Sequence, residues 1–135
     1  MSFGNQLKKF NKDAVEAADR TVRAIKLELF SSIIMDTPVD TGRARGNWQT
    51  NENSPKSGKV DRADRGSAAI SEAESNLGHG DCTTYMTNNL PYIEQLENGS
   101  GKGNGTARDG FHMVAKNIAR IEQIVKKSAR KERRR

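Results

Sequence analysis

The residues that could form a metal site or a nucleophilic site are few: His79, Asp81, Cys82 and His112. His79 and Cys82 are separated by three positions, but no second cysteine or paired histidine completes a zinc-binding set. A thiol nucleophile would also need a base and an orienting group beside it. We therefore expect a histidine in a turn and a small, half-buried cysteine in a strand. A hydrolase that acts at Cys82 is the less favoured alternative.

The acidic residues and the glycine-rich segment give no stronger sign of catalysis. The carboxylates of Glu72, Glu74, Glu94 and Glu97 fall in predicted helices among basic residues, which is typical of solvated helix faces. Gly101 to Gly105 precedes a predicted helix, as phosphate-binding loops do, but no strand comes before it and no Gly-Lys-Ser/Thr closes it. A linker is the better interpretation. We expect no enzyme activity, no metal and no cofactor.

Positive charge is concentrated at the C-terminal end of the chain. The net charge is +6, and residues 126–135 contain one acid and seven basic residues: Lys126, Lys127, Arg130, Lys131, Arg133, Arg134 and Arg135. The remaining 125 residues contain sixteen basic and sixteen acidic residues. Any attraction to nucleic acid should therefore come from this segment rather than from a basic groove. Contact with acidic neighbouring subunits, contact with DNA and a solvated helix end all remain open.

Length and composition indicate one small domain with a modest core. The chain has 135 residues, of which 33% are hydrophobic and 30% are charged. We expect one domain over residues 1–125, followed by a basic tail over 126–135. A single cysteine excludes an internal disulfide and fits a reducing compartment. No apolar run approaches the roughly 20 residues of a membrane helix, and the first residues lack an apolar signal core, so we expect a cytoplasmic product.

Two long helices are predicted from apolar residues at three- and four-residue steps. The first runs from residue 7 to about residue 35, with the stripe Leu7, Phe10, Ala14, Ala18, Val22, Ile25, Leu29 and Ile33. The second runs from residue 111 to about residue 130, with the stripe Phe111, Val114, Ile118, Ile121 and Val125.

Shorter elements are predicted between these helices. Gly46 to Asn51 and Cys82 to Thr87 read as strands, and Ser67 to Leu77 reads as a helix capped by Ser67 and ended by Gly78. Residues 52–66 have little apolar surface to offset their ordering entropy, so we expect a mobile loop or a hairpin ordered only against a neighbour. The expected fold class is α+β: a small, mostly antiparallel sheet packed by a long N-terminal helix and a C-terminal helix, with long flexible loops.

The chain turns at a motif between Thr37 and Trp48. Pro38 disfavours helical backbone at Thr37, so the first helix should end near Met35 or Asp36. Asp40 and Thr41 are typical turn or capping residues, and Gly42 tolerates a positive φ. Arg43 then begins an extended segment that leads to Trp48, which should be buried against a helix.

A second motif, from Thr87 to Gly99, follows the second strand. Its residues are Asn88, Asn89, Pro91, Tyr92, Leu96, Glu97 and Gly99. Asn88 and Asn89 suit a strand end, and Pro91 suits the first turn of a helix. We expect Tyr92, together with Trp48, to anchor the core.

Taken together, the two motifs resemble a family of small tail-completion (neck) proteins of long-tailed bacteriophages and prophages. The resemblance covers roughly residues 20–99 and departs after Gly99, where the family's usual run is replaced by residues 100–110. It implies a structural virion protein that forms a ring of six subunits at the upper end of the tail tube. The implied partners are the tail tube and the head connector, with possible contact to packaged DNA. The implied location is the neck of the virion, with assembly in the host cytoplasm.

A second hypothesis from the residues themselves is a small nucleic-acid-binding protein that acts through its basic C-terminal segment. The balanced charge of the body and the lack of aromatic residues near that segment count against it.

Overall fold

The long first helix dominates the structure, a computed structural model that describes residues 2–39, 41–78, 82–100 and 108–133. Helix α1 spans Phe3–Asp36. It starts at Ser2, whose hydroxyl oxygen accepts a hydrogen bond from the amide of Asn5 at 3.2 Å. It ends at Thr37, which has extended backbone angles before Pro38. The predicted helix and its end near Asp36 are confirmed.

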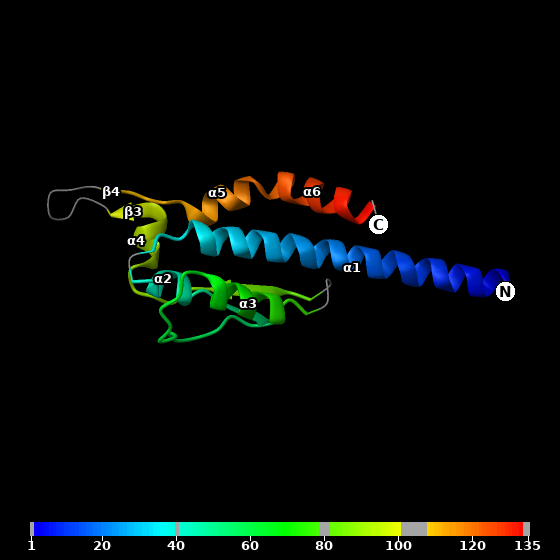
Figure 1. Ribbon diagram of the computed structural model, residues 1–135, viewed down its shortest axis with the longest axis horizontal. Helices are drawn as coiled ribbons and strands as arrows, with labels where there is room; N and C mark the ends of the chain where they lie inside the picture. Colours follow the sequence, from blue (N-terminus) through cyan, green and yellow to red (C-terminus); the bar gives the residue numbers. More distant parts are fainter. Residues whose placement is uncertain (1, 40, 79–81, 101–107, 134–135) are drawn as a thin grey trace.

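The other elements form two layers, one on each side of α1 (Figure 1). One layer contains α5 (Met113–Ala119) and α6 (Ile121–Arg133). The other contains α2 (Arg43–Gly46), α3 (Ser67–Ser75), β1 (Gln49–Glu52) and β2 (Thr84–Thr87). β1 and β2 are antiparallel, with Gln49 opposite Thr87 and Glu52 opposite Thr84. Helix α4 (Ile93–Asn98) and the short antiparallel pair β3 (Gly99–Ser100) and β4 (Arg108–Asp109) lie at one end of the molecule. The α+β class is confirmed.

The core lies around the C-terminal half of α1. One buried cluster joins all three layers and consists of Ile33, Ile34, Trp48, Ala69 and Met113. A second cluster joins α1 to α3 and to Leu77, two residues past the end of α3, and consists of Phe30, Ala73 and Leu77. Met86 of β2 packs against both clusters. Trp48 is therefore buried against a helix, as predicted.

The strand predicted from Gly46 begins later than expected. Residues Arg43–Gly46 form the helical turn α2, in which the amide of Gly46 donates to the carbonyl of Gly42 at 3.0 Å. Gly42 has the predicted positive φ, at 83°. A Cβ atom there would lie 2.8 Å from the backbone nitrogen of Asp64, so this position also requires glycine for space. The strand starts only at Gln49.

Residues 53–66 contain no strand, so the predicted hairpin is wrong. They are an irregular segment whose backbone is hydrogen-bonded to side chains of the body. The amide of Val60 donates to Asn47 Oδ1 at 2.8 Å, and Gln49 Nε2 donates to the carbonyl of Gly58 at 3.0 Å. Arg62 reaches the carbonyl of Gly46 at 2.8 Å. Polar partners therefore hold a segment that has almost no apolar surface.

Helix α3 is capped differently from the prediction. Ser67 is its first helical residue, and Gly66, at φ 124°, is the cap. The side chain that satisfies the helix start is Asp64, whose Oδ2 accepts from the amide of Ala69 at 3.0 Å. The helix ends at Ser75, three residues before Gly78.

The second long helix is divided at Arg120 and buries only part of the predicted stripe, with Val114 packed against the main core cluster. Its buried residues are Met113 and Asn117, whereas Phe111, Ile118 and Val125 are exposed. Asn117 Nδ2 donates to Asp36 Oδ2 at 2.8 Å, so a polar residue faces α1. Residues 126–133 continue α6, so the predicted domain boundary falls inside this helix.

Within the described residues, no helix is long and apolar enough to span a bilayer.

Candidate interaction surfaces

The first sequence motif is organised by a buried contact between Thr37 and Trp48. Trp48 Nε1 donates to Thr37 Oγ1 at 2.8 Å, and the same hydroxyl donates to the carbonyl of Ile33 at 2.8 Å. Both residues are buried. The hydroxyl thus joins the indole to the last turn of α1, which fixes the angle at which the chain leaves the helix.

Arg45 stabilises the outer side of the same corner, a role that the sequence alone did not indicate. Its guanidinium donates to the carbonyls of Thr37 at 2.6 Å, Met35 at 2.7 Å and Arg65 at 2.7 Å. Two of these carbonyls are at the end of α1, where the helix dipole favours a positive charge. The five N–H groups of the planar guanidinium let arginine donate hydrogen bonds to several acceptors at once.

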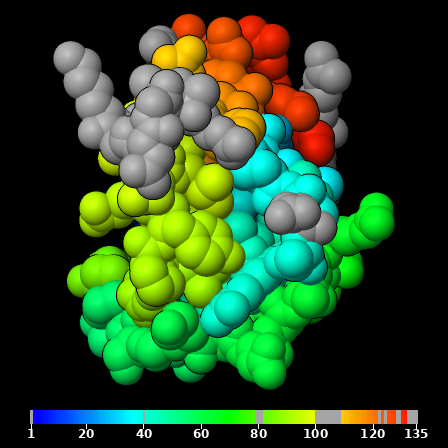
Figure 2. All heavy atoms as spheres, turned by 90° about the vertical axis from the view of Figure 1, so that its left-hand side faces the viewer, coloured from blue at the N-terminus to red at the C-terminus, as the bar shows by residue number. Residues whose placement is uncertain are grey.

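The second motif packs directly on the first. Asn88 Nδ2 donates to the carbonyl of Ala44 at 2.9 Å, and Asn88 Oδ1 accepts from the amide of Leu90 at 3.2 Å. Asn89 Nδ2 donates to the carbonyls of Lys56 and Gly58 at 3.0 and 2.9 Å. Figure 2 shows residues 88–99 in yellow-green beside the cyan corner at this end of the molecule.

Glu97 connects the second motif to the C-terminal helices. Its Oε1 accepts from the amide of Val114 at 2.9 Å and its Oε2 from the amide of Ala115 at 2.9 Å. This carboxylate therefore caps the start of α5. Leu96 packs against the main core cluster.

The remaining motif residues lie nearer the surface. Pro38 is half-buried, and Gly99 has a φ of 92°. The exposed ones are Thr41, Arg43, Pro91 and Tyr92. The expectation that Tyr92 anchors the core is wrong: it is 38% exposed, and Leu90, 3% exposed, is the buried residue of this turn. Asp40 lies outside the described residues. The motifs thus form a structural frame rather than a site with converging reactive groups.

The residues considered for metal or nucleophilic chemistry do not form a site among the described residues. Cys82 is half-buried, and its carbonyl accepts from Lys26 Nζ at 2.6 Å. His112 is exposed at a φ of 51°. Of the candidate carboxylates, Glu72 pairs with Arg62 at 3.0 Å. The described residues contain no group of three potential metal ligands. His79 and Asp81 lie outside them, as do residues 101–107 of the glycine-rich segment.

Asp64 has a perturbed carboxyl group, for structural reasons. Burial acts to raise its pKa, but hydrogen bonds from the amides of Ala69, Ala68 and Gly66 and the charge of Arg62 lower the pKa below its ordinary value of 3.8. The three hydrogen bonds and the positive charge each stabilise the ionised carboxylate. The carboxyl group caps α3, while the backbone amide of Asp64 donates to the carbonyl of Gly42 at 3.0 Å and joins this segment to the corner.

The N-terminal part of α1 carries an uncovered apolar stripe. Phe3 is 75% exposed, Leu7 47% and Phe10 69%. Helix α1 extends past the ends of both neighbouring layers, and none of the described elements lies over this part (Figure 1). The predicted stripe is therefore buried in its C-terminal half alone.

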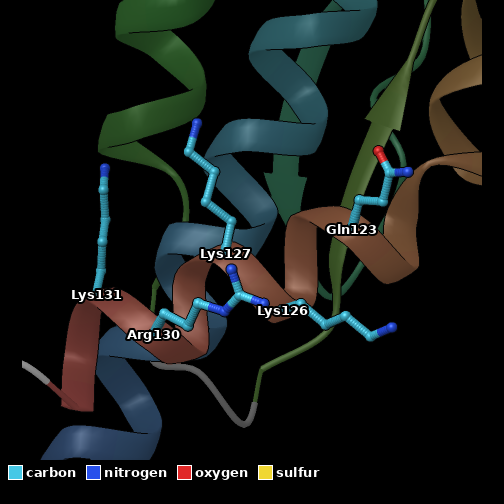
Figure 3. Close-up of a pocket in the computed structure, with 5 residues that line it drawn as sticks. All are labelled: Gln123, Lys126, Lys127, Arg130 and Lys131. Atoms are coloured by element: carbon cyan, nitrogen blue, oxygen red, sulfur yellow. The ribbon is translucent and has the colours of Figure 1, made fainter.

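The basic residues of α6 line one flank of that helix. An open cleft of about 420 Å³ is lined by Gln123, Lys126, Lys127, Arg130 and Lys131 (Figure 3). Lys127 Nζ lies 3.4 Å from Glu28 Oε1, which ties this flank to α1. The backbone of Arg133 ends α6, and Arg134 and Arg135 lie outside the described residues. Such a row of cations can bind a polyanion.

Comparison with protein-family models, with curated proteins and with solved structures finds no match for this chain.

Proposed function

We propose that this protein is a structural assembly subunit of a phage neck, which completes the upper end of the tail tube and joins it to the head connector. The family part of this proposal rests on the two motifs, Thr37–Trp48 and Thr87–Gly99. The pairing of Asn88 with Ala44 supports it, because the motifs then form one structural unit.

The observation that carries the assembly part is the uncovered stripe on α1. Three large apolar side chains, Phe3, Leu7 and Phe10, lie in solvent on a helix that extends beyond the rest of the fold. Contiguous exposed apolar residues of this kind are typical of interaction sites. In a closed ring or on the tail tube, neighbouring subunits would cover these side chains and remove them from solvent. Sixfold symmetry would follow from the family resemblance.

The test is electron microscopy of isolated tail tubes mixed with the purified protein. We expect density at one end of each tube, and we expect Phe10→Glu to reduce the fraction of decorated ends. A protein that decorates no ends, under conditions in which it is folded, would count against the neck assignment.

Contact with nucleic acid is the second candidate function, and the basic flank of α6 favours it. Arg130 and Lys131 line the same cleft as Lys126 and Lys127, so several cations share one side of the helix. In a neck subunit this flank would face packaged DNA. In a free nucleic-acid-binding protein it would be the main binding site.

A further inference from the structure

The sheet formed by β1 and β2 has two outer edges, and the edge of β1 is covered by side chains of the same chain. The carbonyl of Trp48 accepts from Arg62 Nη2 at 3.2 Å, and the carbonyl of Thr50 accepts from Asn76 Nδ2 at 3.1 Å. Backbone groups alternate between the two edges of a strand. The even-numbered residues of β1 therefore point to its covered outer edge, and the odd-numbered residues point to β2.

The outer edge of β2 carries backbone groups that have no partner. The amide of Asn53 donates to the carbonyl of Thr83 at 2.8 Å, which extends the ladder by one pair. Odd-numbered residues of β2 therefore direct their backbone groups to β1, and Thr84 and Met86 direct theirs outward. Across the part of the chain that the structure describes, nothing bonds the amides and carbonyls of Thr84 and Met86.

The surroundings of this edge leave it accessible to another strand. No residue of β2 is buried, and residues 82–90 contain no charged side chain. Exposed edges usually carry charges or a proline that prevent pairing with another chain. The carbonyl of Cys82 already accepts from Lys26 Nζ at 2.6 Å, so the open part of the edge begins at Thr84. An extended strand supplies the donors and acceptors that such an edge lacks.

The open edge is complementary to itself. When two copies of β2 lie antiparallel about a two-fold axis at Tyr85, Thr84 of one copy falls opposite Met86 of the other. Both residues point outward, so each such pair exchanges both of its N–H···O bonds. Tyr85, which is 39% exposed, then falls opposite itself, and Thr83 falls opposite Thr87. Aromatic pairs and threonine pairs across strands are stabilising, and no like charges meet.

We infer that β2 of one copy pairs with β2 of a second copy, which joins the two sheets in the order β1–β2–β2–β1. The same surface is used on both copies, so the contact closes at two copies and is separate from any ring contact. It uses none of the exposed apolar residues of α1. The inference goes beyond the proposed function and does not depend on it.

The first test uses the position of Tyr85 on the two-fold axis. Tyr85→Lys and Tyr85→Glu each place like charges opposite one another, whereas a mixture of the two places opposite charges together. We expect the wild type to be dimeric, each variant to be monomeric and the equimolar mixture to be dimeric again. Sedimentation equilibrium over a concentration series gives the oligomeric state, native mass spectrometry identifies the mixed dimer, and circular dichroism verifies the fold.

The matched control is Tyr92→Glu, because Tyr92 is 38% exposed but lies in the turn before α4. This variant should remain dimeric. Retained pairing in Tyr92→Glu, with pairing lost in Tyr85→Glu, separates the β2 edge from a general effect of added negative charge.

A second test fixes the register without adding charge. Opposing residues of a non-hydrogen-bonded pair have Cα atoms about 4.5 Å apart, within the range of about 4.4 to 6.8 Å that a disulfide spans. Cys82→Ser/Tyr85→Cys should therefore form a disulfide-linked dimer under mild oxidation. Cys82→Ser/Tyr92→Cys should remain unlinked under the same conditions.

Four outcomes would overturn the inference. The wild type could be monomeric at every concentration, or the Tyr85 charge variants could remain dimeric. The mixture of Tyr85→Lys and Tyr85→Glu could remain monomeric. Cysteine at position 85 could also cross-link no faster than cysteine at position 92. None of these outcomes decides the neck assignment, which fails separately if folded protein leaves the ends of tail tubes bare.

Discussion

The hydroxyl of Thr37 accepts a hydrogen bond from Trp48 Nε1 at 2.8 Å, across the corner where α1 ends. Because both groups are buried, this bond joins the longest helix to the chain that enters β1. The first motif is thus a structural joint, and its residues should affect stability more than any binding reaction.

Removing the Thr37 hydroxyl should destabilise the fold. Thr37→Val keeps the shape but leaves the indole N–H of Trp48 without its acceptor, at a cost of about 1–3 kcal/mol. Thr37→Ser keeps the hydroxyl and should lower the free energy of unfolding by less than Thr37→Val does. Urea unfolding followed by tryptophan fluorescence gives both values. Equal losses in the two variants would show that the methyl group, not the hydrogen bond, is what matters.

Arg45 should be sensitive even to lysine. Arg45→Lys keeps the charge, but one ammonium group cannot replace a planar fork that reaches three carbonyls. We expect a loss of about 1–3 kcal/mol in the free energy of unfolding. Arg43→Lys, at an exposed position two residues earlier, should change the free energy of unfolding by less than about 0.5 kcal/mol. Similar effects at both positions would contradict the capping role of Arg45.

The folded protein should lose stability in acid partly through Asp64. Its pKa is lower in the folded state than in the unfolded chain, so its contribution is present above the ordinary pKa of 3.8 and is lost as pH falls through the lower, folded value. Asp64→Asn retains an oxygen acceptor but cannot titrate, so its unfolding free energy should change less with pH between about 5 and 2. Unfolding curves measured across this range provide the comparison. Parallel pH profiles for the two proteins would contradict the assignment.

The basic flank of α6 should bind duplex DNA in a salt-dependent way. Arg130→Glu/Lys131→Glu should weaken binding and reduce the slope of log affinity against log salt, because fewer counterions are released. Lys8→Glu/Lys9→Glu makes the same change in net charge on α1 and serves as the control. Fluorescence anisotropy with a labelled duplex measures both. Equal weakening by the two variants would mean that net charge, rather than the α6 flank, causes the binding.

The sequence predicted the long helix, its end before Pro38 and the positive φ of Gly42, because each depends on local sequence pattern and backbone preference. The burial of Trp48 was predicted because a large aromatic side chain is usually buried for most of its surface. The contacts of Arg45 and Arg62 could not be predicted, since they join residues that only the fold brings together. The capping of α3 by Asp64 is local, five residues from Ala69, and was missed because Ser67 was also a suitable capping residue. Amphipathic stripes were informative in a restricted sense. They identified apolar faces at Leu7 and Phe10 and at Ile118 and Val125, but the pattern does not tell whether the same chain covers them.

Co-sedimentation with isolated tail tubes tests the assembly role most directly. The neck assignment predicts that wild-type protein sediments with tubes and saturates at a fixed, small number of subunits per tube end, independent of tube length. Added duplex DNA should not displace it. A folded protein that stays in the supernatant, or whose binding rises in proportion to tube length, would contradict the assignment.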